Sequence, residues 1–312
     1  MFDDNISREI YFSLNKSLEQ QNAEYMSLKK TKEYKYGSYL CRIIQCLKAG
    51  NWKSIRGFFR NCRWEKKLIM NDESDRKMKN RRSFVADDYF IHDKVAVYTC
   101  VFGKYDSLQE PLIKPDNIDY YIITDQPVPA NSLWKPIPWE SYCSDKLSFA
   151  EKNRYFKMHP ECVFSKYKYS IYIDGNVKVI SDLSPYVKLL GKEGMGFHYH
   201  NQRQCAYDEL EAIKLAYKVR KEDADKYRTF LEKKGLPKKY GLLECNVIVR
   251  DHNNPICKKV MEAWWEQFRR QIKRDQVSLP YVLFSNGIKV DSVAVLGENV
   301  YSNYSFRIAK HN

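Results

Sequence analysis

Residues 169–176 read Tyr-Ser-Ile-Tyr-Ile-Asp-Gly-Asn, an apolar run that ends at an acidic residue. The β-branched and aromatic residues predict a buried strand over residues 169–173. Asp174 and Asn176 follow it, so a carboxylate and an amide oxygen stand at the end of that strand. Gly175 between them lets a ligand approach the backbone closely. The same three residues are also typical of a simple turn, and the triplet alone leaves that interpretation open.

Similar runs on both sides of this strand predict an α/β fold. We expect further strands at residues 95–101, 120–125, 196–200 and 246–249. Apolar residues at helical spacing predict helices at residues 146–158, 207–233 and 255–273, the first capped by Ser144 or Asp145. Strands that alternate with helices indicate a mostly parallel sheet flanked by helices. Ligands of such sheets bind at the carboxyl ends of the strands, where this chain places Asp125 and Asp174.

The first ninety residues differ from the rest, and we divide the chain into residues 1–92 and 93–312. In the first part, apolar residues recur at helical spacing from Leu40 to Leu47 and again from Trp52 to Phe59. Basic residues on the other faces are typical of a helix that lies on an anionic membrane, which predicts peripheral contact through residues 38–67. The alternative is that these helices pack against the main domain. Residues 71–83 have the composition of a polar linker.

The composition excludes several classes of protein. The chain has 312 residues, 44% of them hydrophobic, and a formal net charge of +14, which is typical of a globular protein with an anionic partner. No apolar run approaches the roughly 20 residues of a membrane span, and no signal peptide is visible. The nine cysteines form no C-x-x-C pair, which favours free thiols in a reducing compartment. We therefore expect a cytoplasmic protein, either free or peripheral on the inner face of the membrane.

The end of the strand at Asp174 suits a divalent cation that is shared with a diphosphate. Oxygen atoms are the ligands that Mg²⁺ and Mn²⁺ prefer, so Asp174 and Asn176 are the expected metal ligands, with Mn²⁺ or Mg²⁺ as the cofactor. A D-x-D pattern would supply two carboxylates, and here asparagine replaces the second. Because an amide is a neutral and weaker ligand, we expect a lower affinity for the metal.

Two basic residues precede this strand and an acidic residue lies far downstream. Arg154 and Lys157 are three residues apart, so they share a helix face that suits a diphosphate. Asp275 follows Arg274, whose charge would keep the carboxylate ionised, as is required of a base that takes a proton from a hydroxyl group. Simpler interpretations are a surface pair for the two cations and a helix cap for Asp275.

A series of motifs in one order carries a resemblance to a known family. The motifs are residues 97–106, Ile123-Thr124-Asp125, Asn153-Arg154-x-x-Lys157-x-His159-Pro160, residues 169–175, His200-x-x-Arg203-x-Cys205-x-Tyr207-x-Glu209, Glu244-x-Asn246-x-Ile248-x-Arg250-x-His252, Trp264-Trp265-Glu266 and Arg274-Asp275-Gln276-x-Ser278. Together they resemble the glycosyltransferase-like family that includes plant mucilage-related and turgor-regulation proteins and bacterial surface-polysaccharide enzymes. The resemblance covers roughly residues 94–290.

This resemblance implies a GT-A, Rossmann-like domain that binds a nucleotide sugar, such as a UDP-sugar, through a metal ion. The acceptor would be a glycan or a lipid-linked sugar in cell-surface polysaccharide synthesis. The implied catalytic residues are Asp174, Glu244 and Asp275, the last as the base of an inverting reaction or a positioning residue of a retaining one. The implied donor contacts are Tyr98, Thr99, Asp125, Arg154, Lys157, His200, Arg203, Arg274 and Gln276.

Three other functions are weighed against transfer. Nucleic-acid binding would suit the charge, but the basic residues are spread along the chain and no recognition motif for RNA or DNA occurs, so we expect no nucleic-acid partner. A hydrolase would need a nucleophile or a catalytic metal, and only His198-x-His200 offers two ligands from one strand. An inactive scaffold is the third, because Asn176 replaces a carboxylate. The donor sugar, the acceptor and the stereochemistry stay open.

Overall fold

A computed structural model describes residues 31–48, 50, 91–103, 105–297 and 299–309, together with several residues between 13 and 28. The chain divides into two compact units, Met1–Asn80 and Arg81–Asn312, which we describe separately. The predicted boundary at residues 92/93 and the predicted linker at 71–83 adjoin or fall within residues outside the described ranges, so both stay predictions.

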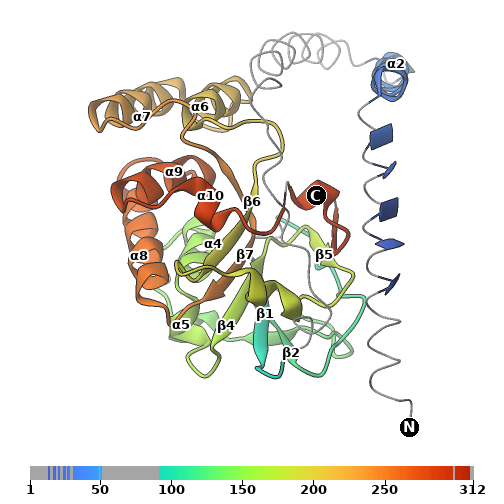
Figure 1. The fold of residues 1–312 in the computed structure, drawn as a ribbon, viewed down its shortest axis with the longest axis vertical. Coiled ribbons are helices and arrows are strands. Elements are labelled where there is room, and N and C mark those ends of the chain that lie inside the picture. The colour runs from blue at the N-terminus through green and yellow to red at the C-terminus, as the bar shows by residue number, and fades with distance from the viewer. Residues whose placement is uncertain are drawn as a thin grey trace. The chain divides into compact units, whose positions relative to one another are not determined.

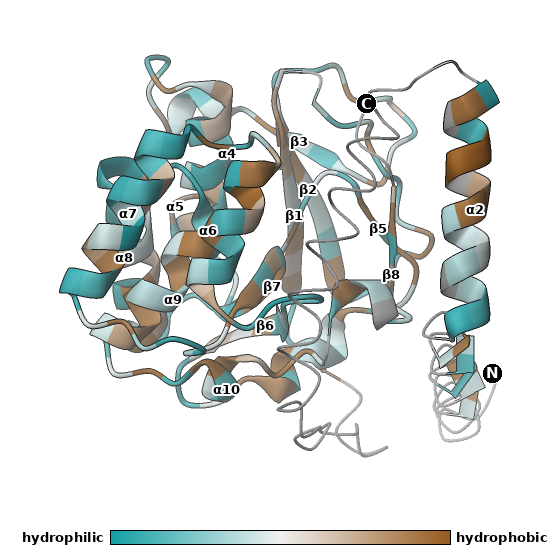
Figure 2. Ribbon diagram, turned by 90° about the horizontal axis from the view of Figure 1, so that it is seen from above, coloured by the Kyte–Doolittle hydropathy of each residue, from teal (hydrophilic) through white to brown (hydrophobic). Residues whose placement is uncertain are grey.

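Helix α2 (Lys32–Lys48) is the helix described in the first unit. It contains the apolar residues whose spacing predicted a helix, and Figure 2 shows hydrophobic and hydrophilic segments along it. Leu40, Ile44 and Leu47 are exposed, by 60%, 41% and 47% of their surface. The second helix that we expected, from Trp52 to Phe59, lies outside the described residues. No helix in the described part of the chain is long and apolar enough to cross a membrane.

The second unit is built on a six-stranded sheet (Figure 1). Its order is β3-β2-β1-β4-β7-β6, and the strands are β1 (Val95–Val101), β2 (Ile118–Thr124), β3 (Lys135–Ile137), β4 (Tyr169–Ile173), β6 (Met195–Tyr199) and β7 (Leu243–Asp251). Strands β3, β2, β1 and β4 pair in parallel, whereas β7 is antiparallel to both β4 and β6. The carboxyl ends of β1, β2 and β4 therefore meet at one edge. The expected mostly parallel α/β sheet is confirmed.

Helices cover one face of this sheet, and a small second sheet covers the other (Figure 2). The helices are α4 (Phe149–Met158), α5 (Pro160–Val163), α6 (Ala206–Leu215), α7 (Lys221–Lys233), α8 (Pro255–Arg270), α9 (Asp275–Ser285) and α10 (Val290–Val293). Of the 3₁₀ turns η2 (Trp139–Ser141), η3 (Ser184–Leu189) and η4 (Val300–Ser302), the last two contribute buried residues to the core on the other face. Strands β5 (Val177–Val179) and β8 (Phe306–Ile308) form the second sheet. A core that includes Phe156, Ile248 and Trp264 fills the helical side, and one that includes Val97, Ile171 and Val249 fills the other.

Two helix predictions are corrected by the structure. Helix α4 begins at Phe149 because Ser148 caps it: the Ser148 hydroxyl and the Glu151 carboxylate satisfy each other's backbone N–H groups in a capping box. The predicted helix at 207–233 is two helices, α6 and α7. Tyr217 between them has a left-handed backbone, with φ of 56°, which ends the first helix.

Candidate active site

Asp174 lies where the sequence predicted, directly after β4. Its backbone N–H donates to the carbonyl of Asn246 on β7 over 2.8 Å, which continues the β4–β7 pairing by one residue. The Tyr172 hydroxyl donates to Asp174 Oδ1 over 2.8 Å, and Lys157 Nζ lies 3.4 Å from the same oxygen. About a third of the Asp174 side chain is exposed, so its carboxylate can meet a ligand.

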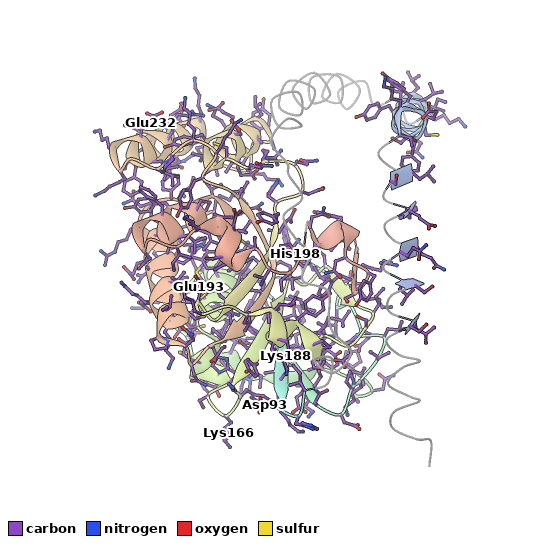
Figure 3. The ribbon with its side chains drawn as sticks, viewed as in Figure 1. Asp93, Lys166, Lys188, Glu193, His198 and Glu232 are labelled. Atoms are coloured by element: carbon purple, nitrogen blue, oxygen red, sulfur yellow. The ribbon has the colours of Figure 1, made fainter. Side chains whose placement is uncertain are left out.

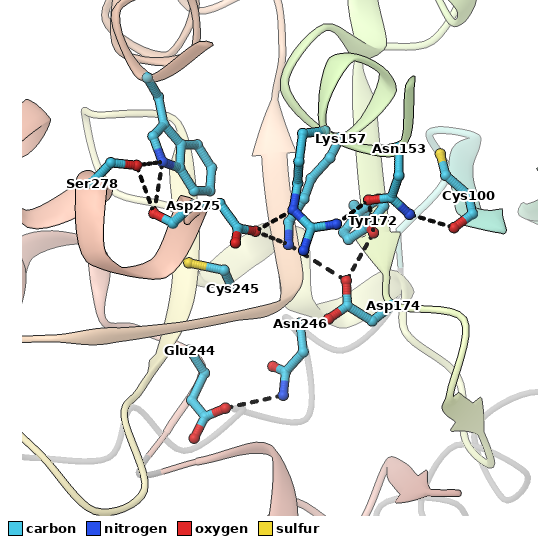
Figure 4. A network of polar contacts seen from close by, with 12 residues as sticks. Cys100, Asn153, Lys157, Tyr172, Asp174, Glu244, Cys245, Asn246, Asp275 and Ser278 are labelled. Carbon is cyan, nitrogen blue, oxygen red and sulfur yellow. Dashed lines mark hydrogen bonds and ion pairs between the residues drawn. The ribbon is translucent and has the colours of Figure 1, made fainter. Parts of the chain in front are cut away.

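Two cations and two carboxylates meet beside this strand (Figure 4). Lys157 Nζ lies 2.7 Å from Asp275 Oδ2, and Arg154 Nε lies 2.9 Å from the same oxygen. Lys157 therefore bridges Asp174 and Asp275. Its side chain is only 1% exposed, whereas that of Arg154 is 27% exposed. Sequence reasoning selected all four residues, and the structure brings them together from β4, α4 and α9.

The carboxyl end of α4 is held by a fully buried pair, Tyr98 and Arg250. The Tyr98 hydroxyl donates to the Phe156 carbonyl over 2.9 Å, and Arg250 donates to both the Lys157 carbonyl and the Tyr98 oxygen. These bonds satisfy carbonyl groups that a helix end leaves unpaired, and they fix the position of Lys157. Burial raises the pKa of Tyr98, which keeps the phenol protonated.

This arrangement corrects the expectation that Tyr98 and Thr99 contact the donor. Tyr98 is 0% exposed and Thr99 is 2% exposed, so neither side chain reaches a ligand. Both lie within β1 rather than past its end, and a strand flanked on both sides is buried on both faces. We therefore leave both residues out of the proposed donor contacts.

Asp275 is held as a carboxylate by its neighbours. Burial alone would raise its pKa, but the positive charges of Arg154 and Lys157 and the N–H group of Gln276 hold that pKa well below the usual range. Asp275 is the first residue of α9, where the helix dipole also favours a negative charge. A carboxylate with so low a proton affinity is a weak base, which argues against the base role we gave Asp275.

Glu244 has a different environment. Its two oxygens accept from neutral groups: the backbone N–H of Asn201 over 2.9 Å and the amide of Asn246 over 3.0 Å. Burial, together with the negative charges of Glu209 and Asp174, raises the pKa of Glu244 to about 7. The carboxyl group thus changes its charge close to neutral pH.

A second group of predicted contacts surrounds Glu209 on α6. Arg203 forms an ion pair with Glu209, and His200 Nε2 lies 3.7 Å from the same carboxylate. His200 Nδ1 accepts the backbone N–H groups of Gln202 and Arg203 over 3.0 Å each. Burial raises the pKa of Glu209, and the charge of Arg274 acts to lower it. The Arg274 side chain donates a hydrogen bond to the Lys218 carbonyl. The predicted residues His200, Arg203 and Arg274 therefore gather around Glu209, whose charge also acts on Glu244.

Two further predicted residues have structural contacts of their own. Asp125 is exposed at the carboxyl end of β2, where both of its oxygens accept the Gly103 backbone N–H over 3.1 Å. Asn176 donates from its amide to the Ala309 carbonyl over 3.2 Å and accepts the Ala309 N–H at its own carbonyl over 2.8 Å. Neither of these two hydrogen bonds uses the side-chain amide oxygen of Asn176.

Asp174 and Asn176, on either side of Gly175, are the predicted ligands of a divalent cation whose coordination phosphate and water would complete. The described residues contain no group of three or more His, Cys, Asp or Glu side chains arranged to hold a metal. Asp174 offers its second carboxylate oxygen and Asn176 its amide oxygen. Mg²⁺ commonly takes one or two protein oxygens and keeps the rest of its shell for substrate phosphates and water. Metal binding by Asp174 and Asn176 therefore stays a prediction.

The histidine pair that suggested a hydrolase does not form a metal site. His198 is fully buried inside the fold (Figure 3), and its Nε2 lies 3.0 Å from the amide nitrogen of Asn303. Burial lowers the pKa of His198 to about 3, which keeps the ring neutral. His200 contacts the Glu209 group instead, so the two rings have different partners.

The structure adds site residues that sequence reasoning missed. Burial and the negative charges of Glu244 and Asp174 raise the pKa of Tyr301, a half-exposed residue of η4, so this side chain lies within electrostatic range of both carboxylates. A Cβ atom on Gly175 would lie 2.6 Å from Val101 Cγ2 and 3.1 Å from Asp106 Oδ2. The loop after β1 thus packs against residue 175, which explains the glycine. No sequence pattern marks Tyr301, because it is distant in sequence from every other site residue.

The family model of the TOD1/MUCI70 glycosyltransferase-like domain matches residues 145–307, just over half of the chain. The chain belongs to this family. The match includes β4, β7 and α9, and with them Asp174, Glu244 and Asp275. It also includes Tyr301. Strands β1 to β3 lie before the matched residues, although the motif at residues 97–106 contributed to the resemblance.

Several glycosyltransferase structures resemble the TOD1/MUCI70-type chain at low identity. The bifunctional glycosyltransferase WbbM has 12% identity and a TM-score of 0.43, over 62% of this chain and 38% of WbbM. Mouse xyloside xylosyltransferase 1 has 8% identity and a TM-score of 0.38, over 62% of this chain and 83% of the xylosyltransferase. Galactosyltransferase LgtC, in complex with donor and acceptor sugar analogues, has 13% identity and a TM-score of 0.34, over 62% of this chain and 72% of LgtC. Similarities as low as these do not indicate which donor or acceptor this chain uses. No curated protein matches the chain.

Proposed function

We propose that this chain transfers a sugar from a nucleotide sugar, a UDP-sugar in the simplest case, to a glycan or lipid-linked acceptor of cell-surface polysaccharide synthesis. Membership of a glycosyltransferase-like family supports the reaction class. The observation that carries the proposal is the contact of Lys157 with both Asp174 and Asp275 at the carboxyl edge of the sheet. This edge is where α/β sheets bind nucleotides.

The charges of this cluster support a metal-assisted reaction. Arg154 and Lys157 contribute two positive charges, and Asp174 and Asp275 contribute two negative ones, so the four groups sum to zero. A diphosphate that binds beside Asp174 would meet no net positive charge from them. A bound Mn²⁺ or Mg²⁺ would supply that charge, polarise the diphosphate and stabilise it as a leaving group. Arg154, which is partly exposed, is the cation of the cluster that can contact the diphosphate directly.

Nucleotide binding tests the donor class. The full chain is heated with UDP, GDP, CDP or ADP, each with and without Mn²⁺, and its melting temperature is recorded. A ligand at 100 times its Kd adds about 2.7 kcal/mol to the free energy of unfolding, so the melting temperature rises by several degrees. We expect that rise with UDP plus Mn²⁺ and a smaller one with UDP alone.

A flat response to every nucleotide, with and without metal, would contradict the proposal. It would favour an inactive scaffold, the alternative that the contact between Asn176 and Ala309 keeps open. A rise with another nucleotide would correct the base while keeping the reaction class.

We also propose that helix α2 contacts an anionic membrane surface, because its apolar residues are exposed. Leu40→Glu with Leu47→Glu is expected to weaken binding to vesicles that contain phosphatidylglycerol by at least about tenfold. Each buried leucine contributes about 1.5–3 kcal/mol, and the new carboxylates are repelled by the lipid. Co-sedimentation with vesicles measures the effect. Ser38→Glu with Gln45→Glu is the control, since it makes the same charge change on the other side of the helix. Equal binding by both variants, or no binding of the unaltered chain at low salt, would contradict the proposal.

A further inference from the structure

The carboxylates of the site differ in the groups that hold them. Asp275 pairs with two cations and Asp174 with Lys157. Glu209 pairs with Arg203. Glu244 pairs with no cation of the described residues, and both of its hydrogen bonds come from neutral N–H groups. Of these four carboxylates, Glu244 is thus the one without a cationic partner among the described residues.

The position of Glu244 is set by strand β7. The Asn246 carbonyl bonds to the Asp174 N–H, and the Asn246 amide bonds to the Glu244 carboxylate, so Asn246 lies between the two acidic residues (Figure 4). The pairing of β6 with β7 shifts its register between Gly196 and His198, and His198 pairs with Glu244. Such irregularities redirect side chains and are frequent beside active sites.

Groups from five elements either donate a hydrogen bond to this carboxylate or interact with its charge. They are Asn246 on β7, Asn201 after β6, Glu209 on α6, Asp174 after β4 and Tyr301 on η4. None of them carries a positive charge, and two are acidic. The Glu244 side chain is 7% exposed, so solvent screens these charges weakly.

A proton acceptor works best when its proton affinity is close to the working pH. Asp275 fails this requirement, because two cations already stabilise its ionised form. Glu244 meets it, because burial and acidic neighbours raise its pKa to about 7.

We infer that Glu244 takes the proton of the acceptor hydroxyl during sugar transfer, while Asp275 positions Arg154 and Lys157. The inference rests on the proposed transferase function. The acceptor oxygen forms a bond to the anomeric carbon as its O–H bond breaks, and the proton passes to the Glu244 carboxylate. The bond between the anomeric carbon and the diphosphate oxygen breaks, and its electron pair leaves with the nucleoside diphosphate. Atoms and charges balance without any further reactant.

The direction of the pH dependence follows from this role. Only the ionised form of Glu244 accepts a proton, so the transfer rate rises as the pH increases through the pKa that Glu244 has in the complex with donor and metal, and it levels off above that pH. Below that pH the carboxyl group is protonated and the rate falls tenfold for each pH unit.

The test compares Glu244→Gln, Glu244→Asp and the unaltered full chain. Release of UDP from a panel of UDP-sugars is followed with Mn²⁺ and a mixture of saccharide acceptors, between about pH 5.5 and 8.5. Loss of a general base lowers a rate by about 10²–10⁴-fold, so we expect that loss in Glu244→Gln at neutral and higher pH. We expect Glu244→Asp, which keeps a carboxylate, to recover part of the rate. The thermal shift with UDP and Mn²⁺ should be unchanged in both variants.

Glu193→Gln is the matched control, because Glu193 is a glutamate of similar burial in the turn before β6 (Figure 3). It should keep both the rate and the pH profile. Two results would overturn the inference and leave the transferase function intact. One is a transfer rate in Glu244→Gln close to that of the unaltered chain. The other is a rate that falls at acid pH by the same factor in Glu244→Gln and in the unaltered chain. Failure of the unaltered chain to bind any nucleotide or release UDP would overturn the proposed function, and with it the inference.

Discussion

Replacing Asp174 with asparagine is expected to lower the rate of sugar transfer by about 10³-fold or more, while the fold is retained. Asparagine has the same shape and can still accept the hydrogen bond of the Tyr172 hydroxyl. It lacks the charge that attracts Lys157 and the carboxylate that would bind a divalent cation. A metal contributes several kcal/mol to the stabilisation of a transition state, and about 1.4 kcal/mol corresponds to a factor of ten.

Two measurements on Asp174→Asn separate chemistry from folding. The rate of UDP release gives the activity, and chemical unfolding gives the stability, which should change little because Lys157 keeps its contact with Asp275. Asp119→Asn is the control: Asp119 pairs with lysine side chains as Asp174 does, in its case Lys94 and Lys135, but it lies near the start of β2, at the opposite edge of the sheet. Undiminished transfer by Asp174→Asn would remove Asp174 from the proposed site.

Replacing Asp275 with asparagine is expected to destabilise the protein by about 3–5 kcal/mol, the usual effect of removing one partner of a buried ion pair. Lys157 is almost completely buried and would keep only the longer contact with Asp174. Unfolding in guanidinium chloride measures the change. The depressed pKa of Asp275 means that the ionised form stabilises the fold at neutral pH and that this stability is lost as the pH falls into the acidic range.

The matched control for Asp275→Asn is Glu151→Gln. Glu151 pairs with Lys273 over the same 2.7 Å, but the lysine side chain is 60% exposed. Exposed pairs contribute about 0–1 kcal/mol, so we expect Glu151→Gln to change stability little apart from its role in the cap of α4. Equal losses in the two variants would show that burial does not set the strength of the Asp275 contacts.

The strands were predictable because their pattern is local. Residues 95–101 and 169–173 are apolar runs, the first followed by Phe102-Gly103 and the second by Asp174, and such runs form central strands in nearly any α/β context. The three-residue strands β3, β5 and β8 were missed, because a run of three residues carries no periodicity. The break at Tyr217 was missed as well, since the charged residues on either side of it continue a helical pattern.

The site was predictable only where chemistry depends on neighbours in sequence. Arg154 and Lys157 were selected because they share one turn of a helix, and Asp174 because it ends a strand. The assignment of Asp275 as a base was an inference from Arg274 beside it in sequence. In the structure its partners are Arg154 and Lys157 instead, and their charges oppose that role.

From the amino-acid sequence alone, the α/β class, the main strands and the acidic residue at the end of β4 could be determined, because each depends on the hydrophobic pattern within a few residues. The tertiary structure alone decided which carboxylates pair with a cation and which has none among the described residues. Charge states depend on burial and on distances of a few ångströms between groups more than a hundred residues apart, as with Lys157 and Asp275. For the same reason it decided that Tyr98 supports α4 and that Tyr301 lies within electrostatic range of Glu244.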